Sequence, residues 1–384
     1  MTPSLTRSLG AAVLASAVAV IPVPLVGGMG VLIQRDLGFG DAALGAAITA
    51  FFVAAAITAP LAGHLSEWIG PRVVAWLGLG CIMAALLGIG LAADTWLLLT
   101  VFLFLAGVGH ASTLLAVGVL LTRSVGPRRQ GISFGTTQAS APIASIVAGL
   151  AVPAVGLTLG WRVVFVACVS LGLVAAALVP AAQRRARTSE RRARTPALRR
   201  ALFTLALGMA LASAGGNAAV VFLVPSSINA GLSTADAGVV LATASAVGLA
   251  VRVIAGWWSD RLGGTGIGLL ASVIGVGAIG YLGLAASPQG WLLVVSSLLA
   301  LGGGWGWPGL MLLAATRSNP SAPGAALGIV TFGGLSGAVV GPLAFGAVAE
   351  TASYSLSWLL MGFLALASVV LALAGRRRLL VARN

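Results

Sequence analysis

The chain has 384 residues, of which 59% are hydrophobic and 8% are charged. Soluble domains draw on roughly 25% charged residues to keep their surface wetted, so this composition excludes a soluble globular fold. The formal net charge is +14, and every one of the 22 basic residues is arginine. These arginines lie in short connectors between long apolar runs, which argues against a nucleic-acid partner and for a lipid bilayer.

A helix needs about 20 apolar residues to cross the hydrocarbon core of a bilayer. Cut at its charges and at Gly, Pro and Ser breaks, the chain yields twelve such runs, which predicts an all-α membrane protein with 12 transmembrane helices. The first run is too long for a signal-peptide core, so we expect it to remain as the first span. The predicted spans are residues 9–33, 42–64, 73–93, 96–122, 131–156, 161–182, 201–228, 236–258, 265–286, 290–316, 324–349 and 355–375.

The placement of arginine predicts how these helices are oriented, because cytoplasmic connectors of membrane proteins carry the excess of positive charge. With both termini inside, all arginines except Arg35, Arg162 and Arg252 fall in cytoplasmic segments. We therefore expect a multi-pass protein of the bacterial inner membrane with cytoplasmic termini. At the opposite face we expect interfacial tryptophans and solvated acidic residues, namely Trp96, Trp161, Trp291, Trp358, Asp36 and Glu350.

The two halves of the chain repeat one pattern. A shift of 193 or 194 residues brings glycines and their neighbours into register. The matched pairs include Gly38 with Gly231, Gly63 with Gly256, Ser66 with Ser259, Gly109 with Gly303, and Thr122-Arg-Ser124 with Thr316-Arg-Ser318. We therefore predict two pseudo-symmetric six-helix bundles, residues 1–182 and 201–384, joined by a basic cytoplasmic linker at residues 183–200. Parallel repeats of this kind are typical of transporters with a binding site near the bilayer midplane.

Two short segments resemble the signature loop of the major facilitator superfamily. They are Gly63-His-Leu-Ser-Glu-Trp-Ile-Gly-Pro-Arg72 and Gly256-Trp-Trp-Ser-Asp-Arg-Leu-Gly263. Gly160-Trp-Arg162 before the sixth span is also similar to the family pattern, whereas Glu67 departs from it because aspartate is usual there. The resemblance covers the whole chain and implies a transporter that works by alternating access.

The resemblance implies that these two loops form a conformational gate rather than a substrate site. A carboxylate there can satisfy the positive N-terminus of a neighbouring helix and pair with an arginine, for which Arg72 and Arg261 are candidates. The alternative is that the charges only solvate a turn. The predicted gating residues are Gly63, Glu67, Gly70, Arg72, Gly256, Asp260, Arg261 and Gly263.

Arg252 is the one charged residue well inside a predicted span, where insertion costs about 3 kcal/mol. Its segment, Val251-Arg-Val-Ile-Ala-Gly256, resembles helix 8 of monocarboxylate and oxalate transporters, and the resemblance implies that Arg252 binds a substrate carboxylate. The planar guanidinium suits an oxyanion. A structural or gating role also fits, because the side chain lies near enough to the cytoplasmic interface to extend toward it.

Four further residues are candidates for the substrate site. His110, in the fourth span, could carry a coupled proton or serve as a neutral hydrogen-bonding group between helices. Gln138 and Asn217 could line a cavity or join helices. The glycine-rich residues 302–308 predict a bend in the tenth span that would place Trp305 against the cavity, although glycine-eased packing explains them too.

The eleventh predicted span carries a ridge of small residues. Gly333, Gly337 and Gly341 follow one another at spacing four, which places them on one helical face. Such a ridge lets another helix come close, so we expect a tight helix contact there.

The predicted function is secondary active transport of a small organic solute, with an organic anion such as a monocarboxylate as the first candidate. Efflux of a hydrophobic or drug-like compound is the alternative, since polar residues are scarce in the spans. A non-transporting membrane sensor is an alternative from a different class. The sequence has no nucleotide-binding motif, metal-ligand cluster or catalytic set, so we expect a monomer without cofactor, metal or enzymatic activity that uses a proton or solute gradient.

Overall fold

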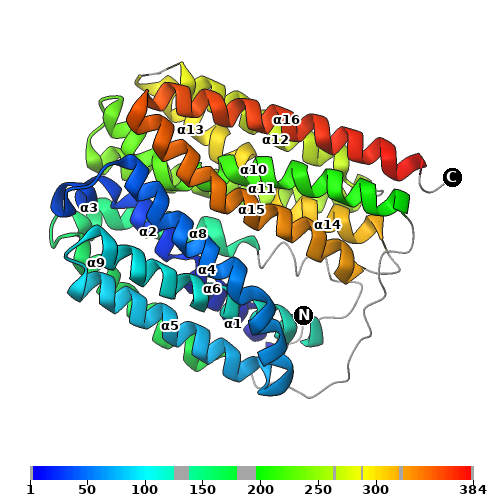
Figure 1. Ribbon diagram of the computed structural model, residues 1–384, viewed down its shortest axis with the longest axis horizontal. Helices are drawn as coiled ribbons and strands as arrows, with labels where there is room; N and C mark the ends of the chain where they lie inside the picture. The colour runs from blue at the N-terminus through cyan, green and yellow to red at the C-terminus, as the bar shows by residue number, and fades with distance from the viewer. Residues whose placement is uncertain are drawn as a thin grey trace. The chain divides into compact units, whose positions relative to one another are not determined.

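The computed structural model of the chain describes residues 3–124, 138–179, 196–262, 265–286, 289–319 and 323–381, and all regular structure in these ranges is helical (Figure 1). By contacts between residues, the chain divides into two compact units, residues 1–185 with 220–243 and residues 186–219 with 244–384. The predicted boundary between two bundles at residues 183–200 stays a prediction, because residues 180–195 lie outside the described ranges.

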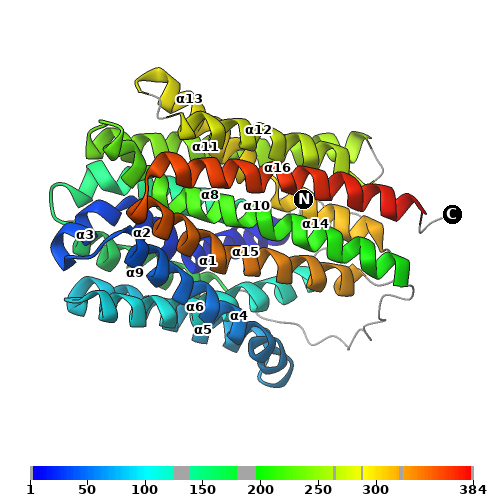
Figure 2. The same ribbon diagram turned by 45° about the horizontal axis from the view of Figure 1, so that its top comes forward.

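The first unit is built on long helices that pack around α6. Both α4 and α5 run along α6, and α9 runs along α5 (Figures 1 and 2). The helices of this part of the chain are α1 (Pro3–Val20), α2 (Pro22–Gly28), α3 (Gly30–Leu37), α4 (Asp41–Trp68), α5 (Pro71–Ala92), α6 (Trp96–Ser124), α8 (Ser140–Ala151), the π-helical turn η2 (Val152–Gly156) and α9 (Trp161–Leu178).

The second unit repeats this packing. Its helix α12 runs along α13 and α16, as α5 runs along α6 and α9 in the first unit. The helices of this part of the chain are α10 (Pro196–Asn229), α11 (Thr234–Leu262), α12 (Ile267–Ala285), α13 (Trp291–Gly304), α14 (Pro308–Ser318), α15 (Pro323–Thr351) and α16 (Tyr354–Val381). Residues 220–229 of α10 and 234–243 of α11 belong to the first unit.

The described helices confirm the all-α membrane fold. Ten of them are long and apolar enough to cross a bilayer, and the bent pair Gly10–Val20 and Pro22–Gly28 makes up to eleven. The predicted span 131–156 is described only from residue 138, as the shorter apolar helix Ser140–Gly156. One boundary was wrong: residues 9–33 are not one helix, because the axis bends by 51° at Ile21, where Pro22 cannot donate to the preceding turn.

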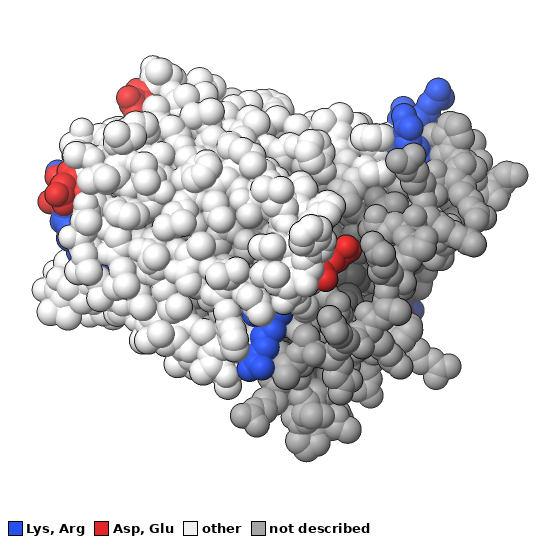
Figure 3. All heavy atoms as spheres, turned by 60° about the horizontal axis from the view of Figure 1, so that its bottom comes forward, with Lys and Arg blue, Asp and Glu red and all other residues white. Residues whose placement is uncertain are grey.

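The outward faces of these helices suit hydrocarbon rather than water. Large apolar side chains stand exposed along them, such as Leu61, Phe332 and Val370. On the face seen in Figure 3, most of the described surface carries neither acidic nor basic residues. An apolar surface of this extent identifies a multi-pass membrane protein.

The internal repeat is visible in the backbone. Gly38 and Gly231, which the sequence register pairs, both adopt positive φ (+69° and +99°) and follow the ends of α3 and α10. Glycine is favoured there because side chains with a Cβ are strained in this conformation. The helix contacts repeat as well, since a Cβ on Gly109 would lie 2.5 Å from the Gly78 carbonyl oxygen and one on Gly303 would lie 2.3 Å from the Gly277 nitrogen.

The small-residue ridge of α15 makes the close contact that its spacing predicts. A Cβ on Gly333, Gly337 or Gly341 would lie 2.1, 1.9 or 2.3 Å from a backbone carbonyl oxygen of α10. Those carbonyls belong to Ala206, Ala210 and Ala214, which also follow one another at spacing four. The two helices therefore meet backbone to backbone, which only small residues allow.

Candidate functional site

The bend predicted for residues 302–308 is a break between α13 and α14. Helix α13 ends at Gly304, and α14 begins at Pro308, whose ring cannot continue the hydrogen-bond ladder. Between them, the indole nitrogen of the fully buried Trp307 donates to the Gly304 carbonyl at 2.8 Å. The indole rings of Trp305 and Trp307 pack edge to face with centroids 6.2 Å apart.

Arg252 on α11 holds this break. Its side chain is buried, with 5% of the residue exposed. Its Nε and Nη2 atoms donate to the Trp305 carbonyl oxygen at 3.1 and 2.6 Å. Its guanidinium carbon also lies 5.5 Å from the centroid of the Trp305 indole. The structure therefore brings together two of the residues that the sequence predicts for the substrate site.

The Trp305 indole completes a small aromatic region between α10 and α12. A Cβ on Gly216 would lie 2.0 Å from Trp305 Cε3, so the ring rests on the α10 backbone. Tyr281 of α12, whose hydroxyl would lie 2.2 Å from a Cβ on Gly304, is stacked on Trp358 with ring centroids 5.9 Å apart. The Trp305 indole nitrogen and the Tyr281 hydroxyl are both buried and have no hydrogen-bond partner among the described residues. Two donors are thus available beside the break.

Asn217, the residue after Gly216, makes its hydrogen bonds within α10. Its amide nitrogen donates to the carbonyl and the hydroxyl of Ser213, at 2.9 and 3.1 Å. The Ser213 hydroxyl in turn donates to the Gly334 carbonyl of α15 at 2.7 Å. The bond between helices is thus made by Ser213, and both roles considered for Asn217 stay predictions.

His110 and Gln138 belong to the first unit. The buried His110 of α6 donates from Nδ1 to the Ala19 carbonyl of α1 at 2.9 Å, and its ring packs on Phe51 of α4 with centroids 5.0 Å apart. These contacts fit a hydrogen-bonding group between helices. Gln138 is half-buried and precedes α8.

The first predicted gating loop joins α4 to α5. Gly70 adopts positive φ (+91°) between the two helices, and a Cβ on Gly63 would meet no atom within 4 Å. Arg72 places its guanidinium 4.6 Å from the centroid of the Trp76 ring. Within the part of the chain that the structure describes, Glu67 is exposed and forms no ion pair, so the pairing with Arg72 considered above is absent.

The second predicted gating loop is held by a different arginine from the one expected. Asp260 pairs with Arg317 of α14 at 2.6 Å, and Arg317 also donates to the Ser259 carbonyl at 3.3 Å. Arg261 instead lies over the Trp257 ring, 3.6 Å from its centroid. Consecutive residues of a helix point in different directions, which explains why Arg261 does not reach Asp260.

Two further glycines belong to the predicted gating loop after α11. Gly256 resembles Gly63, since a Cβ there would also meet no atom within 4 Å. Gly263 lies outside the described residues. Arg317 was not among the predicted gating residues, although it lies in Thr316-Arg-Ser318, one of the segments that repeat between the two halves of the sequence.

An ion pair that the sequence did not suggest joins the end of α3 to the start of α9. Asp36 is exposed, as expected, and its carboxylate also binds the Arg162 guanidinium and accepts a hydrogen bond from the Trp161 indole at 3.1 Å. Arg162 also donates to the Ala93 carbonyl at 3.2 Å. The hydrogen bond from Arg162 is the main reason that the pKa of Asp36 lies below its usual value.

Trp358 lies near the start of α16 in the second unit. It was expected at the membrane interface, but only 2% of it is exposed, and its ring packs edge to face on Phe345 with centroids 4.7 Å apart. Trp291 is 71% exposed, as expected for an interfacial residue. The described residues include no group of three or more His, Cys, Asp or Glu side chains that could hold a metal ion.

The sequence and the fold are similar to those of known transporters. A family model described as Major Facilitator Superfamily matches residues 8–285, which is most of the chain. The chain belongs to the major facilitator superfamily. Two sequences named as uncharacterized MFS-type transporters from two strains of Mycobacterium tuberculosis are each 28% identical to it over 323 residues, covering 80% of this chain and 71% of the relative.

Further comparisons agree with membership of the major facilitator superfamily. A third uncharacterized MFS-type transporter of Mycobacterium tuberculosis is 30% identical over 153 residues, covering 39% of this chain and 26% of the relative. A crystal structure of a bacterial homolog to the human lysosomal transporter Spinster, in an inward-facing and unoccupied conformation, shares the fold with a TM-score of 0.72. It is 17% identical, and the match covers 100% of this chain and 97% of that one. The protein is thus a multi-pass membrane transporter.

Proposed function

We propose that this major facilitator transporter moves a small organic anion, such as a monocarboxylate, and that Arg252 binds the carboxylate. The observation that carries the proposal is the burial of the Arg252 guanidinium within a membrane span, against the backbone of a broken helix. Placing an arginine in a span costs about 3 kcal/mol, so a side chain kept there needs a reason.

The contact with Trp305 supplies a mechanism. The Trp305 carbonyl is a neutral acceptor, and a charged acceptor makes hydrogen bonds that are roughly twice as strong. A substrate carboxylate would therefore compete for the Nε and Nη2 donors that now hold that carbonyl. Binding of the anion would release the break between α13 and α14, which couples substrate recognition to a change in helix shape.

The two loops after α4 and α11 would serve as the gate of this cycle. The ion pair between Asp260 and Arg317 supports that role in the second loop, because it links α11 to α14, the helix that follows the break. Gly63, Glu67, Gly70 and Arg72 would act in the first loop. Energy would come from a proton or solute gradient, since the sequence has no phosphate-binding loop. A location in the bacterial inner membrane with cytoplasmic termini fits the placement of arginine, and we expect the protein to act as a monomer.

Transport assays in proteoliposomes test the proposal. The panel would consist of radiolabelled monocarboxylates and the neutral amides of the same carbon chains. We expect uptake of acids but not of amides, and loss of uptake in Arg252→Gln. The matched control is Arg35→Gln, which changes an exposed arginine at the end of α3. Acid uptake that persists in Arg252→Gln would remove Arg252 from the substrate site.

Efflux of a hydrophobic compound is the second candidate. The unpartnered donors of Trp305 and Tyr281, set among aromatic rings, favour a largely apolar ligand with a neutral hydrogen-bond acceptor. Uptake of amides at the same rate as acids would support this candidate. Because the relatives are named as transporters, either candidate fits them better than a membrane sensor does.

A further inference from the structure

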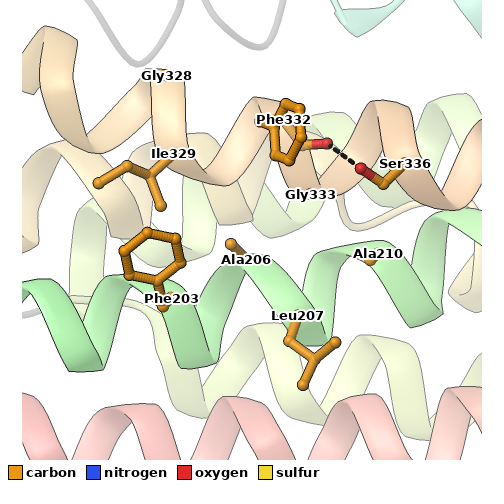
Figure 4. A pocket seen from close by; sticks show the side chains of 9 residues that line it. All are labelled: Phe203, Ala206, Leu207, Ala210, Gly328, Ile329, Phe332, Gly333 and Ser336. Atoms are coloured by element: carbon orange, nitrogen blue, oxygen red, sulfur yellow. Dashed lines mark hydrogen bonds between the residues drawn. The ribbon is translucent and has the colours of Figure 1, made fainter.

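An apolar groove runs between α10 and α15 in the second unit, and its lining includes neither Arg252 nor Trp305. Its volume is about 510 Å³, and its walls include Phe203 and Leu207 of α10 and Ile329 and Phe332 of α15 (Figure 4). Along α10 the lining residues extend from Phe203 to Ala210, which corresponds to about 10 Å of helix rise.

The groove is shaped by small and large residues on the same two helices. Gly333 brings α15 against the Ala206 carbonyl and so forms the floor. The two phenylalanines form the sides, since Phe203 is 55% exposed and Phe332 is 71% exposed. The hydroxyl of Ser336 donates to the Phe332 carbonyl of its own helix at 2.9 Å, as Figure 4 shows. A flexible apolar chain is the ligand that such walls accept.

Positive charge stands at one end of the groove. The guanidinium of Arg199 lies 5.9 Å from the centroid of the Phe203 ring, and both Arg199 and the adjacent Arg200 are exposed. From α16, Arg378 donates to the Thr204 hydroxyl at 2.7 Å. An apolar groove with a basic end matches a molecule that has an apolar tail and an anionic head.

We propose that this groove binds one acyl chain of an anionic membrane phospholipid, with the lipid phosphate at Arg199. Phospholipid is the abundant molecule of this chemistry around a membrane-spanning helix, and basic residues attract anionic headgroups at the membrane surface. The bound lipid would cover Phe203 and Phe332 and brace α15 against α10. The site is independent of the substrate proposed above, because it shares no residue with the region around Trp305.

Photocrosslinking of the full-length protein tests the site. The protein is reconstituted with phosphatidylglycerol that carries a diazirine in one acyl chain, and labelled peptides are identified by mass spectrometry. The same label on phosphatidylcholine reports contacts that do not depend on a net negative headgroup. We expect phosphatidylglycerol to label residues 203–210 and 328–336 at least severalfold more strongly than phosphatidylcholine does.

Two variants test binding of the acyl chain and binding of the lipid headgroup separately. Gly328→Leu fills the groove without a clash, because a Cβ there would meet no atom within 4 Å, and it should abolish labelling of these peptides. Gly275→Leu on α12 is the matched control, since it also faces open space outside the groove. Arg199→Gln should lower phosphatidylglycerol labelling about fivefold, the factor expected for one basic residue at an anionic surface, and should leave phosphatidylcholine labelling unchanged.

Three results would overturn the proposal. Undiminished labelling in Gly328→Leu would place the lipid elsewhere. Equal labelling by both lipids, with no effect of Arg199→Gln, would reduce the contact to ordinary bulk lipid. Displacement of the label by a transported monocarboxylate or amide at its KM would make the groove part of the substrate path.

Discussion

The Trp305 carbonyl oxygen accepts hydrogen bonds from both Nε and Nη2 of Arg252, so two donors of one side chain on α11 bind the backbone at the break between α13 and α14. Substitution by lysine keeps the charge but loses the planar guanidinium that carries both donors. We predict that Arg252→Lys lowers anion uptake about tenfold or more, in line with a loss of about 1.5–3 kcal/mol for a hydrogen bond to a charged group. Initial uptake rates in proteoliposomes measure the loss, and uptake at the wild-type rate would contradict it.

The contact between Gly337 and the Ala210 carbonyl leaves no room for a methyl group, because a Cβ would lie 1.9 Å from that oxygen. Gly337→Ala should lower the free energy of unfolding by about 1–3 kcal/mol, the usual cost of overpacking. Gly328→Ala, on the same helix but facing open space, should be neutral or stabilising by up to about 1 kcal/mol. Thermal unfolding in detergent compares the two, and equal melting temperatures would show that α15 and α10 can separate.

The ion pair of Asp36 and Arg162 predicts a pH dependence of stability. The pKa of Asp36 is lowered in the folded protein, chiefly by the hydrogen bond from Arg162. The pair therefore contributes fully above the ordinary carboxyl pKa of about 3.9 and loses its contribution as pH falls through the lowered value. Both side chains are partly exposed, at 38% and 44%, so the contribution should stay below about 1 kcal/mol.

Melting curves of the wild type and Asp36→Asn, recorded from neutral pH downward, measure that contribution. Their difference should be constant near neutral pH and should vanish in strong acid. It should also become much smaller at every pH when Arg162→Gln is the common background, which leaves the hydrogen bond from the Trp161 indole. A difference that grows on acidification would have the wrong sign for this pair.

The pairing of Asp260 with Arg317 predicts how the proposed gate responds to mutation. Asp260→Asn and Arg317→Gln should each lower the maximal transport rate and leave the substrate KM unchanged. The double variant should be no slower than either single one, because one contact is lost in all three. Asp260→Asn combined with Arg261→Gln should instead be additive, since Arg261 lies over Trp257. Additive effects of Asp260 and Arg317 would show that their contact does not act in transport.

Much of the fold was predictable because a segment that crosses the hydrocarbon core of a bilayer must be a helix of about 20 apolar residues. Long apolar runs, arginines between them and glycines in register defined the helices and the repeat, and the break before Pro308 followed from glycine and proline alone. Side-chain partners were less predictable, because the charge of a residue and its position in the sequence do not tell where its side chain points. Asp36 is exposed as expected, but its pairing with Arg162 was not predicted, and Asp260 binds Arg317 rather than Arg261. The ring of Trp358 was expected at the interface because sequence cannot tell which face of a helix is buried.

The backbone contacts of Gly78 with Gly109 and of Gly277 with Gly303 bear on how motion in this protein can be observed. No side chain separates the helices at these points. The pair α5 and α6 should therefore move as one rigid rod during turnover, and the pair α12 and α13 as another. Spin labels on both members of one rod would keep a constant separation and so calibrate the experiment. A label on one rod and another on a gating loop would then record displacement that belongs to the gate alone.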